Sequence, residues 1–152
     1  MDLSSSGAKV IVFSQFTSFL EILRKRIRLA LPELRILELS GSTRNRSVPV
    51  DNFENNSGPI VLLASLKAAG LGVTLKSADY VFLMDPWWNP AVEEQAIDRA
   101  HRLGRVNPTF IYRLVAKGTI EERVRQLKIK KKETFHSIIG QMNGFNLSLI
   151  HI

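Results

Sequence analysis

The sequence contains no cysteine, which excludes disulfide bonds and metal sites built from thiolates. Its three histidines, His101, His136 and His151, do not follow the spacing of a metal-binding motif. No apolar run approaches the length that spans a bilayer, and the first residues lack the apolar core of a signal peptide. We therefore expect a soluble, intracellular protein with no metal site of its own.

The usual nucleotide-binding motifs are also absent. The phosphate-loop pattern GxxxxGK[ST] occurs nowhere, and no acidic pair follows a predicted strand in the way that a Mg²⁺ site requires. Gly70 and Gly72 follow an apolar run, but Leu75 stands where a dinucleotide fingerprint needs its third glycine. A dehydrogenase-like site is therefore disfavoured. The two glycines more simply allow close approach of the backbone to a ligand or to a neighbouring element.

The composition is that of a globular protein with an excess of positive charge. In 152 residues, 45% are hydrophobic and 23% are charged, which suffices for one domain that buries most of its apolar surface. A net charge of +7 favours an anionic partner, with nucleic acid ahead of a membrane surface. We expect a flexible leader at residues 1–8, one domain at 9–140 and a tail with little pattern at 141–152.

Short apolar runs alternate with segments of helical periodicity. One helix is predicted to begin at Thr17 or Ser18, where Ser18 and Glu21 have the spacing of a capping box, and another runs from Thr119 toward Gly140. Strands are predicted at residues 9–13, 34–39, 60–64, 80–84 and 109–115. This alternation predicts an α/β fold with a mostly parallel, doubly wound sheet.

Polar residues follow three of the predicted strands, and parallel strands bring such positions to one edge of the sheet. The three polar residues are Ser14, Ser65 and Asp85. Ligands of doubly wound sheets bind at the carboxyl ends of the strands. We therefore expect the functional site at this edge.

The segment at residues 85–105 has the strongest chemical pattern. Asn89 can cap a helix, Pro90 suits its first position and Gly104 is a natural stop. Guanidinium groups on a helix can hold phosphate oxygens, although a solvated face with local ion pairs is the ordinary alternative. Without a phosphate loop, such a helix is half of an active site that another domain completes. The residues that share this face are Gln95, Asp98, Arg99 and Arg102.

Aromatic and basic residues near the same edge fit a nucleic-acid surface. Trp87 and Trp88 either pack at the edge of the core or contact nucleic acid, and the sequence leaves both readings open. Lys67, Arg44 and Arg46 lie in predicted loops and suit contacts with phosphates that do not depend on base sequence. The basic run at residues 128–132 is most simply a solvated helix face.

Four motifs, in this order, resemble those of a known family. They are KVIVFSQFTSFLEIL, LLASLKAAGLGVTL, DPWWNPAVEEQAIDRAHRLGR and YRLVAKGTIEERV. They look like the carboxyl-terminal RecA-like lobe of SWI/SNF-type ATPases, which are superfamily-two DNA translocases. The resemblance covers residues 9–140, and the motif sequences are most similar to those of the RING-associated DNA-damage-tolerance branch.

The resemblance implies roles at an ATP site shared between two lobes. Arg99 and Arg102 match the family's arginine fingers, which reach the ATP phosphates across the cleft. Gln95 and Asp98 match the supporting residues of the same motif, and Gly70 lies in a motif that borders the nucleotide. ATP with Mg²⁺ is expected to bind mainly to an N-terminal RecA-like lobe of the same polypeptide.

The resemblance also implies contacts with double-stranded DNA. Lys67 and Trp88 match positions that touch the DNA backbone or minor groove, while Ser14 and Gln15 match a motif near the bound strand. The helix at residues 119–140 resembles the family's brace. Chromatin or repair proteins are implied as further partners and a membrane is not, with the nucleus as the location in a eukaryote and the nucleoid otherwise.

This chain departs from the family pattern at four positions. The family usually has Gln at Arg105, Gly at Ala69 and Asn at Thr74, and Pro49 interrupts a segment that it often makes helical. We expect a second motor lobe that hydrolyses no ATP by itself. The alternatives are a stand-alone nucleic-acid-binding module and, less favoured, an RNA helicase lobe.

Overall fold

The computed structural model describes residues 7–69, 73–85, 87, 89–100, 108–124, 126–127, 129–130 and 134. The chain divides into two compact units, Met1–Val115 and Ala116–Ile152. None of the described helices combines the length and apolar character needed to cross a membrane. Among the same residues, no cluster of His, Asp or Glu side chains has the arrangement of a metal site.

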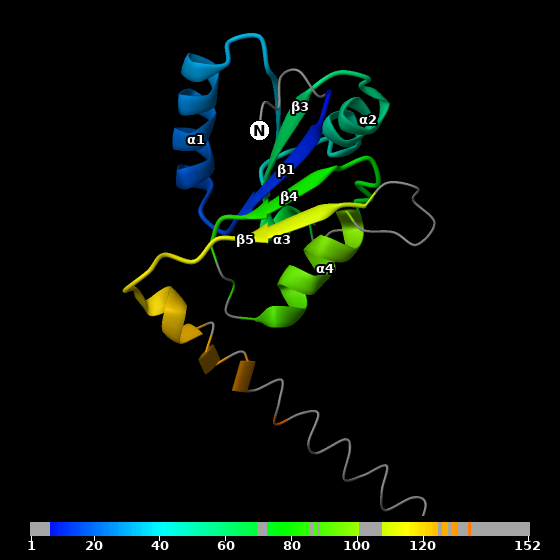
Figure 1. Cartoon of the computed structure of the whole chain (residues 1–152). Coiled ribbons are helices and arrows are strands. Elements are labelled where there is room, and N and C mark those ends of the chain that lie inside the picture. The colour runs from blue at the N-terminus through cyan, green and yellow to red at the C-terminus, as the bar shows by residue number, and fades with distance from the viewer. Residues whose placement is uncertain are drawn as a thin grey trace, which may run out of the picture. The chain divides into compact units, whose positions relative to one another are not determined.

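The first unit is built on a five-stranded sheet in the order β2-β3-β1-β4-β5 (Figure 1). All four strand pairings are parallel. The strands are β1 (Lys9–Ser14), β2 (Arg35–Leu39), β3 (Ile60–Ser65), β4 (Tyr80–Leu83) and β5 (Phe110–Arg113). All five strands predicted from apolar runs are therefore confirmed, together with the α/β class.

Helices cover the two faces of the sheet unequally. Helix α1 (Thr17–Ala30) packs on one face, while α2 (Ser47–Asn55), α3 (Leu66–Ala69) and α4 (Pro90–Ala100) pack on the other (Figure 1). The connection through α1 runs from β1 toward the β2 edge, and the later connections run in the opposite direction. Because parallel crossovers are right-handed, reversing the direction moves the helix to the opposite face.

The core lies on both sides of β1 and β3. Along β1, Ile11 and Phe13 pack with α2, α3 and α4, whereas Val10 and Val12 pack with α1. Every residue of β3 is buried, as predicted for an interior strand covered on both faces. These interior strands hold the carboxyl edge of the sheet in place.

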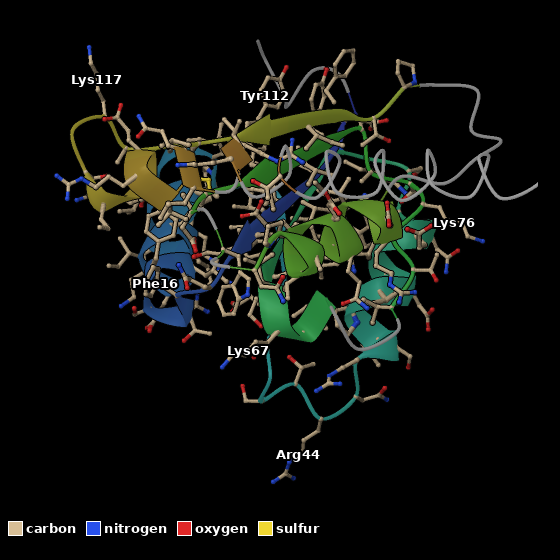
Figure 2. The ribbon with its side chains drawn as sticks, turned by 90° about the horizontal axis from the view of Figure 1, so that it is seen from below. Phe16, Arg44, Lys67, Lys76, Tyr112 and Lys117 are labelled. Carbon is tan, nitrogen blue, oxygen red and sulfur yellow. The ribbon has the colours of Figure 1, made fainter. Side chains whose placement is uncertain are left out.

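Aromatic side chains form a ladder on the α1 side of β4 and β5. The rings of Tyr80 and Phe110 stack with centroids 5.7 Å apart, and those of Phe82 and Tyr112 stack at 5.0 Å. Phe110 and Tyr112 remain about half exposed, and Tyr112 projects from the sheet in Figure 2. Cross-strand stacking thus stabilises this edge of the sheet.

Two local predictions were wrong. Helix α2 begins at Ser47 and includes Pro49, which does not interrupt it. Proline is tolerated there because amides in the first turn have no partner within the helix. Helix α1 begins at Thr17 as predicted, but no side chain caps it, and Glu21 forms an ion pair with Lys25 at 3.4 Å instead of a capping box.

In the second unit, residues 120–124, 126–127, 129–130 and 134 are helical. Thr119 caps this helix, because its Oγ1 accepts the Glu121 amide at 3.2 Å. The Glu122 carboxylate accepts the Gly118 amide at 3.1 Å, one residue earlier than a capping box requires. The remaining part of the predicted brace, the tail and residues 1–6 lie outside the described residues.

Candidate functional site

The serines at the ends of β1 and β3 shape the turns that follow. Ser14 and Ser65 pair in register as the last residues of adjacent strands. The Ser14 hydroxyl accepts the Phe16 amide at 3.0 Å, and the Ser65 hydroxyl accepts the Ala68 amide at 3.3 Å. Both serines are buried. Any effect of Ser14 on a bound strand therefore acts through the turn, not through a direct contact of its hydroxyl.

Asp85 joins the end of β4 to the turn between β1 and α1. The Asp85 side chain is 6% exposed, and its Oδ2 accepts the Gln15 amide at 2.9 Å. Its Oδ1 is buried and has no hydrogen-bond partner among the described residues. The predicted clustering of Ser14, Ser65 and Asp85 at one edge is thus confirmed.

The loop between β4 and α4 is held by a second buried carboxylate. Glu93, 7% exposed in the first part of α4, accepts the backbone amide of Trp87. Trp87 is half-buried and packs against the hydrophobic core. For Trp87, the structure supports packing at the edge of the core. Trp88, predicted to contact DNA, lies outside the described residues.

Helix α4 begins as its sequence predicts. Pro90 is its first residue, and the Asn89 side-chain oxygen accepts the Ala91 amide at 3.1 Å. One face of the helix is buried through Glu93, Ala96, Ile97 and Ala100. The opposite face is exposed and forms the wall of a shallow hollow of about 390 Å³, lined by Ala91, Val92, Glu94, Gln95 and Asp98.

Arg99 lies at the border between these two faces and is half-buried. Its carbonyl oxygen accepts the Leu75 amide at 2.9 Å, which ties the end of α4 to the segment that follows α3. Gln95 and Asp98 are exposed on the same helix. Arg102 and Gly70 lie outside the described residues, so their placement stays a prediction.

Basic side chains project from two connections at this same edge of the sheet, those that follow β3 and β2. Lys67 is exposed on α3, directly after β3, and Arg44 is exposed in the connection that follows β2. Both project away from the sheet in Figure 2. Gln15 is only half-buried, and Phe16 beside it is 56% exposed. Phe16 was not predicted as a functional residue, because a phenylalanine after a strand most often enters the core.

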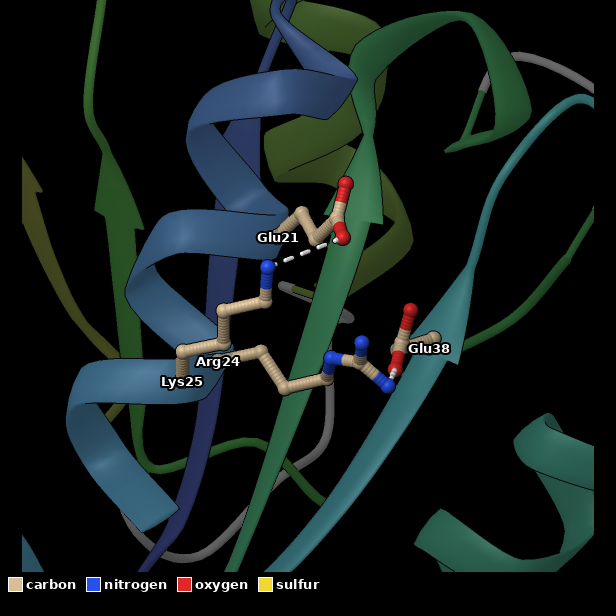
Figure 3. A network of polar contacts seen from close by, with 4 residues as sticks. All are labelled: Glu21, Arg24, Lys25 and Glu38. Atoms are coloured by element: carbon tan, nitrogen blue, oxygen red, sulfur yellow. Dashed lines mark ion pairs between the residues drawn. The ribbon is translucent and has the colours of Figure 1, made fainter. Parts of the chain in front are cut away.

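A second hollow of about 580 Å³ opens between the first turn of α1 and the connection after β2. Hydroxyl groups of Thr17, Ser18, Ser40 and Ser42 line it. Arg24 also lines it and pairs with Glu38 at 3.1 Å, as Figure 3 shows. This hollow therefore presents hydroxyl groups and a neutralised ion pair.

The helicase conserved C-terminal domain family matches residues 1–104 of the chain. The chain belongs to this family. The matched residues contain strands β1 to β4 and helix α4 of this helicase C-terminal domain. The matched residues also include Arg99, Arg102 and the predicted DNA contacts.

Curated relatives of this helicase C-terminal domain are DNA repair and SWI/SNF-related proteins. DNA repair protein RAD5B of Arabidopsis thaliana is 45% identical over 129 residues, which cover 85% of this chain and 10% of that protein. A putative SWI/SNF-related regulator of chromatin, subfamily A member 3-like 1, from the same plant is 47% identical over 130 residues, covering 83% and 14%. The chain thus spans between 10% and 14% of the length of these two relatives.

A solved structure has the same fold. The C-terminal part of the Fun30 ATPase domain superposes with a TM-score of 0.71 at 37% sequence identity, covering 81% of this chain and 40% of that one. The predicted RecA-like fold is confirmed, and so is the resemblance to SWI/SNF-type helicases.

Proposed function

We propose that this helicase C-terminal domain is the second motor lobe of an ATP-dependent translocase on double-stranded DNA, of the repair or chromatin-remodelling type. The observation that carries the proposal is the bond between Asp85 and Gln15, which joins the predicted DNA-contacting turn to the loop that leads into α4. The names of the relatives support DNA repair or chromatin as the setting. In a eukaryote the lobe would work in the nucleus, beside repair or chromatin proteins.

ATP hydrolysis by this mechanism requires a second, N-terminal RecA-like lobe. None of the residues that line the hollow on α4 carries a positive charge, so this surface does not suit a complete nucleotide site. The N-terminal lobe would hold ATP and Mg²⁺. Arg99 and Arg102 would then offset the charge on the transferring phosphate, a contribution of roughly 10³ to 10⁵ in rate.

The other residues on this edge would position the lobe on its two ligands. Gln95 and Asp98 present hydrogen-bonding groups beside Arg99 on α4, and Gly70 borders the nucleotide. Closure of the two lobes would shift the edge along the DNA backbone and so convert hydrolysis into translocation. The residues that would contact DNA are Gln15, Arg44, Lys67 and Trp88, with Ser14 acting through the turn.

The test compares ATP hydrolysis by two proteins, with and without duplex DNA. One is this chain alone, and the other is a chimaera in which residues 9–140 replace the matching lobe of the Fun30 ATPase domain. We expect no turnover from the chain alone. We expect DNA-stimulated turnover from the chimaera, lost in the Arg99→Ala and Arg102→Ala variants and kept in an Arg28→Ala control on α1.

Three results would contradict the proposal. Hydrolysis by the isolated chain that disappears in the Arg99→Ala variant would show a complete site in this lobe. A chimaera that binds duplex DNA without hydrolysing ATP would favour the alternative, a nucleic-acid-binding module without ATPase coupling. If RNA stimulated turnover as well as duplex DNA does, the result would instead favour an RNA helicase lobe.

A further inference from the structure

Phe16 is a large apolar side chain exposed at the edge where DNA is proposed to bind. It precedes the first residue of α1 and is 56% exposed (Figure 2). A single exposed apolar residue is ordinary on a protein surface. The features that distinguish Phe16 are how its backbone is held and which side chains leave the sheet beside it.

Two buried acceptors fix the turn that carries Phe16. Ser14, fully buried, accepts the Phe16 amide at 3.0 Å, and Asp85 accepts the amide of Gln15 at 2.9 Å. The Phe16 backbone is extended, with φ −96° and ψ 104°. A turn held in this way presents the ring with little freedom to lose on binding, which favours contact with a partner.

Cationic side chains leave the sheet next to this ring. Ser14 pairs with Ser65, and Phe16 and Lys67 each come two residues after these partners. Adjacent strands lie only about 4.8 Å apart, so the ring and the ammonium group emerge from neighbouring turns. Arg44 follows β2, the next strand of the sheet. An aromatic ring beside cations combines an apolar contact with phosphate contacts.

We propose that Phe16 is a DNA-contacting residue whose ring packs into the minor groove of the duplex, while Lys67 and Arg44 hold the adjoining phosphates. This inference rests on the proposed function and adds to it an apolar contact. The strength of this apolar contact does not depend on counterion release, because the ring neutralises no phosphate. The dependence of DNA binding on salt concentration can therefore distinguish a contact made by the ring from contacts made by Lys67 and Arg44.

The experiment measures binding of the 152-residue chain to a fluorescent duplex of mixed sequence by anisotropy, from about 50 mM to about 200 mM salt. Phe16→Ala should weaken binding by roughly 5- to 100-fold at every salt concentration and leave the salt dependence unchanged. Lys67→Ala should instead reduce the slope of log K against log salt by about 1. Phe16→Trp should bind at least as well as the unsubstituted chain.

The matched control is Phe19→Ala, since Phe19 is also exposed but lies within α1. It should bind DNA as the unsubstituted chain does. The urea midpoint of Phe16→Ala should also stay unchanged, which separates lost contact from lost folding.

Three outcomes would overturn the inference. If Phe16→Ala binds normally while Lys67→Ala is weakened, the edge binds DNA without the ring, and the proposed function stands. If Phe16→Ala binds normally but abolishes hydrolysis by the chimaera, the ring contacts the other lobe instead of DNA. If the unsubstituted chain and the chimaera both fail to bind duplex DNA, the proposed function fails together with the inference.

Discussion

Two buried carboxylates hold the loop between β4 and α4 at its two ends. Asp85 accepts an amide from the β1–α1 turn, and Glu93 accepts the amide of Trp87 within the loop itself. Both side chains are more than nine-tenths buried. A buried carboxylate that accepts backbone amides orders the segments that supply them, because an amide left without a partner is unfavourable.

Asp85→Ala should destabilise the chain by about 1–3 kcal/mol, because the partly buried Gln15 amide loses its acceptor. Asp85→Asn keeps an oxygen for that amide. It places the side-chain NH₂ at the Oδ1 position, where no described group is bonded. Asp85→Asn should therefore lower the free energy of unfolding by less than Asp85→Ala does. Urea unfolding of the two variants measures the difference, and equal losses would contradict the role of Asp85 as an acceptor.

At the scale of single elements, α4 and α1 differ in how their ends are made. Helix α4 has a side-chain cap from Asn89 and proline in its first position, both readable from neighbouring residues. Helix α1 begins without a side-chain cap, directly after a turn held by Ser14 and Asp85. The turn substitutes for the cap by fixing where the helix begins. A capping-box pattern in the sequence therefore gave the wrong expectation there.

Asn89→Ala should reduce the free energy of unfolding by about 0.5–2 kcal/mol, because the Ala91 amide loses its cap. Asn89→Asp should restore most of this loss, since aspartate caps helices equally well and is favoured by the helix dipole. Thermal and urea unfolding, followed by circular dichroism, provide the measurement. An alanine variant as stable as the unsubstituted chain would show that the bond from Asn89 adds nothing to α4.

At the scale of the sheet unit, Lys9 connects three elements at the edge opposite the candidate site. Its ammonium group donates to the carbonyl oxygens of Phe53 and Glu54 at 2.9 and 2.7 Å, at the end of α2. Its backbone amide donates to Asp79, just before β4, at 2.9 Å. A cation at the carbonyl end of a helix is stabilising, so Lys9 fastens β1 to α2 and to the turn before β4.

Lys9→Met should lower the free energy of unfolding by about 1–3 kcal/mol, because two charge-assisted hydrogen bonds are lost while the apolar stem is kept. Lys76→Met is the matched control, since Lys76 is exposed in a turn (Figure 2). It should change stability by less than about 0.5 kcal/mol. Urea unfolding measures both, and a similar effect from the two substitutions would mean that loss of charge, not the contact, is responsible.

The sequence by itself determined most of the elements of this protein. Apolar periodicity depends on near neighbours, so it predicted the five strands and the parallel α/β class. The capping residue Asn89 and the first-position Pro90 predicted the start of α4 in the same local way. Motif order also predicted membership of the helicase family. Pro49 was misjudged because its effect depends on where the helix begins, and only the folded chain sets that position.

Only the tertiary structure decided which residues meet and which stay exposed. The bond between Asp85 and Gln15 joins positions 70 residues apart, and it exists because β4 lies beside β1 in the sheet. Likewise, the burial of Ser14 and the exposure of Phe16 follow from a turn that two distant strands shape together. Contacts of this kind depend on strand order, which local sequence patterns do not encode.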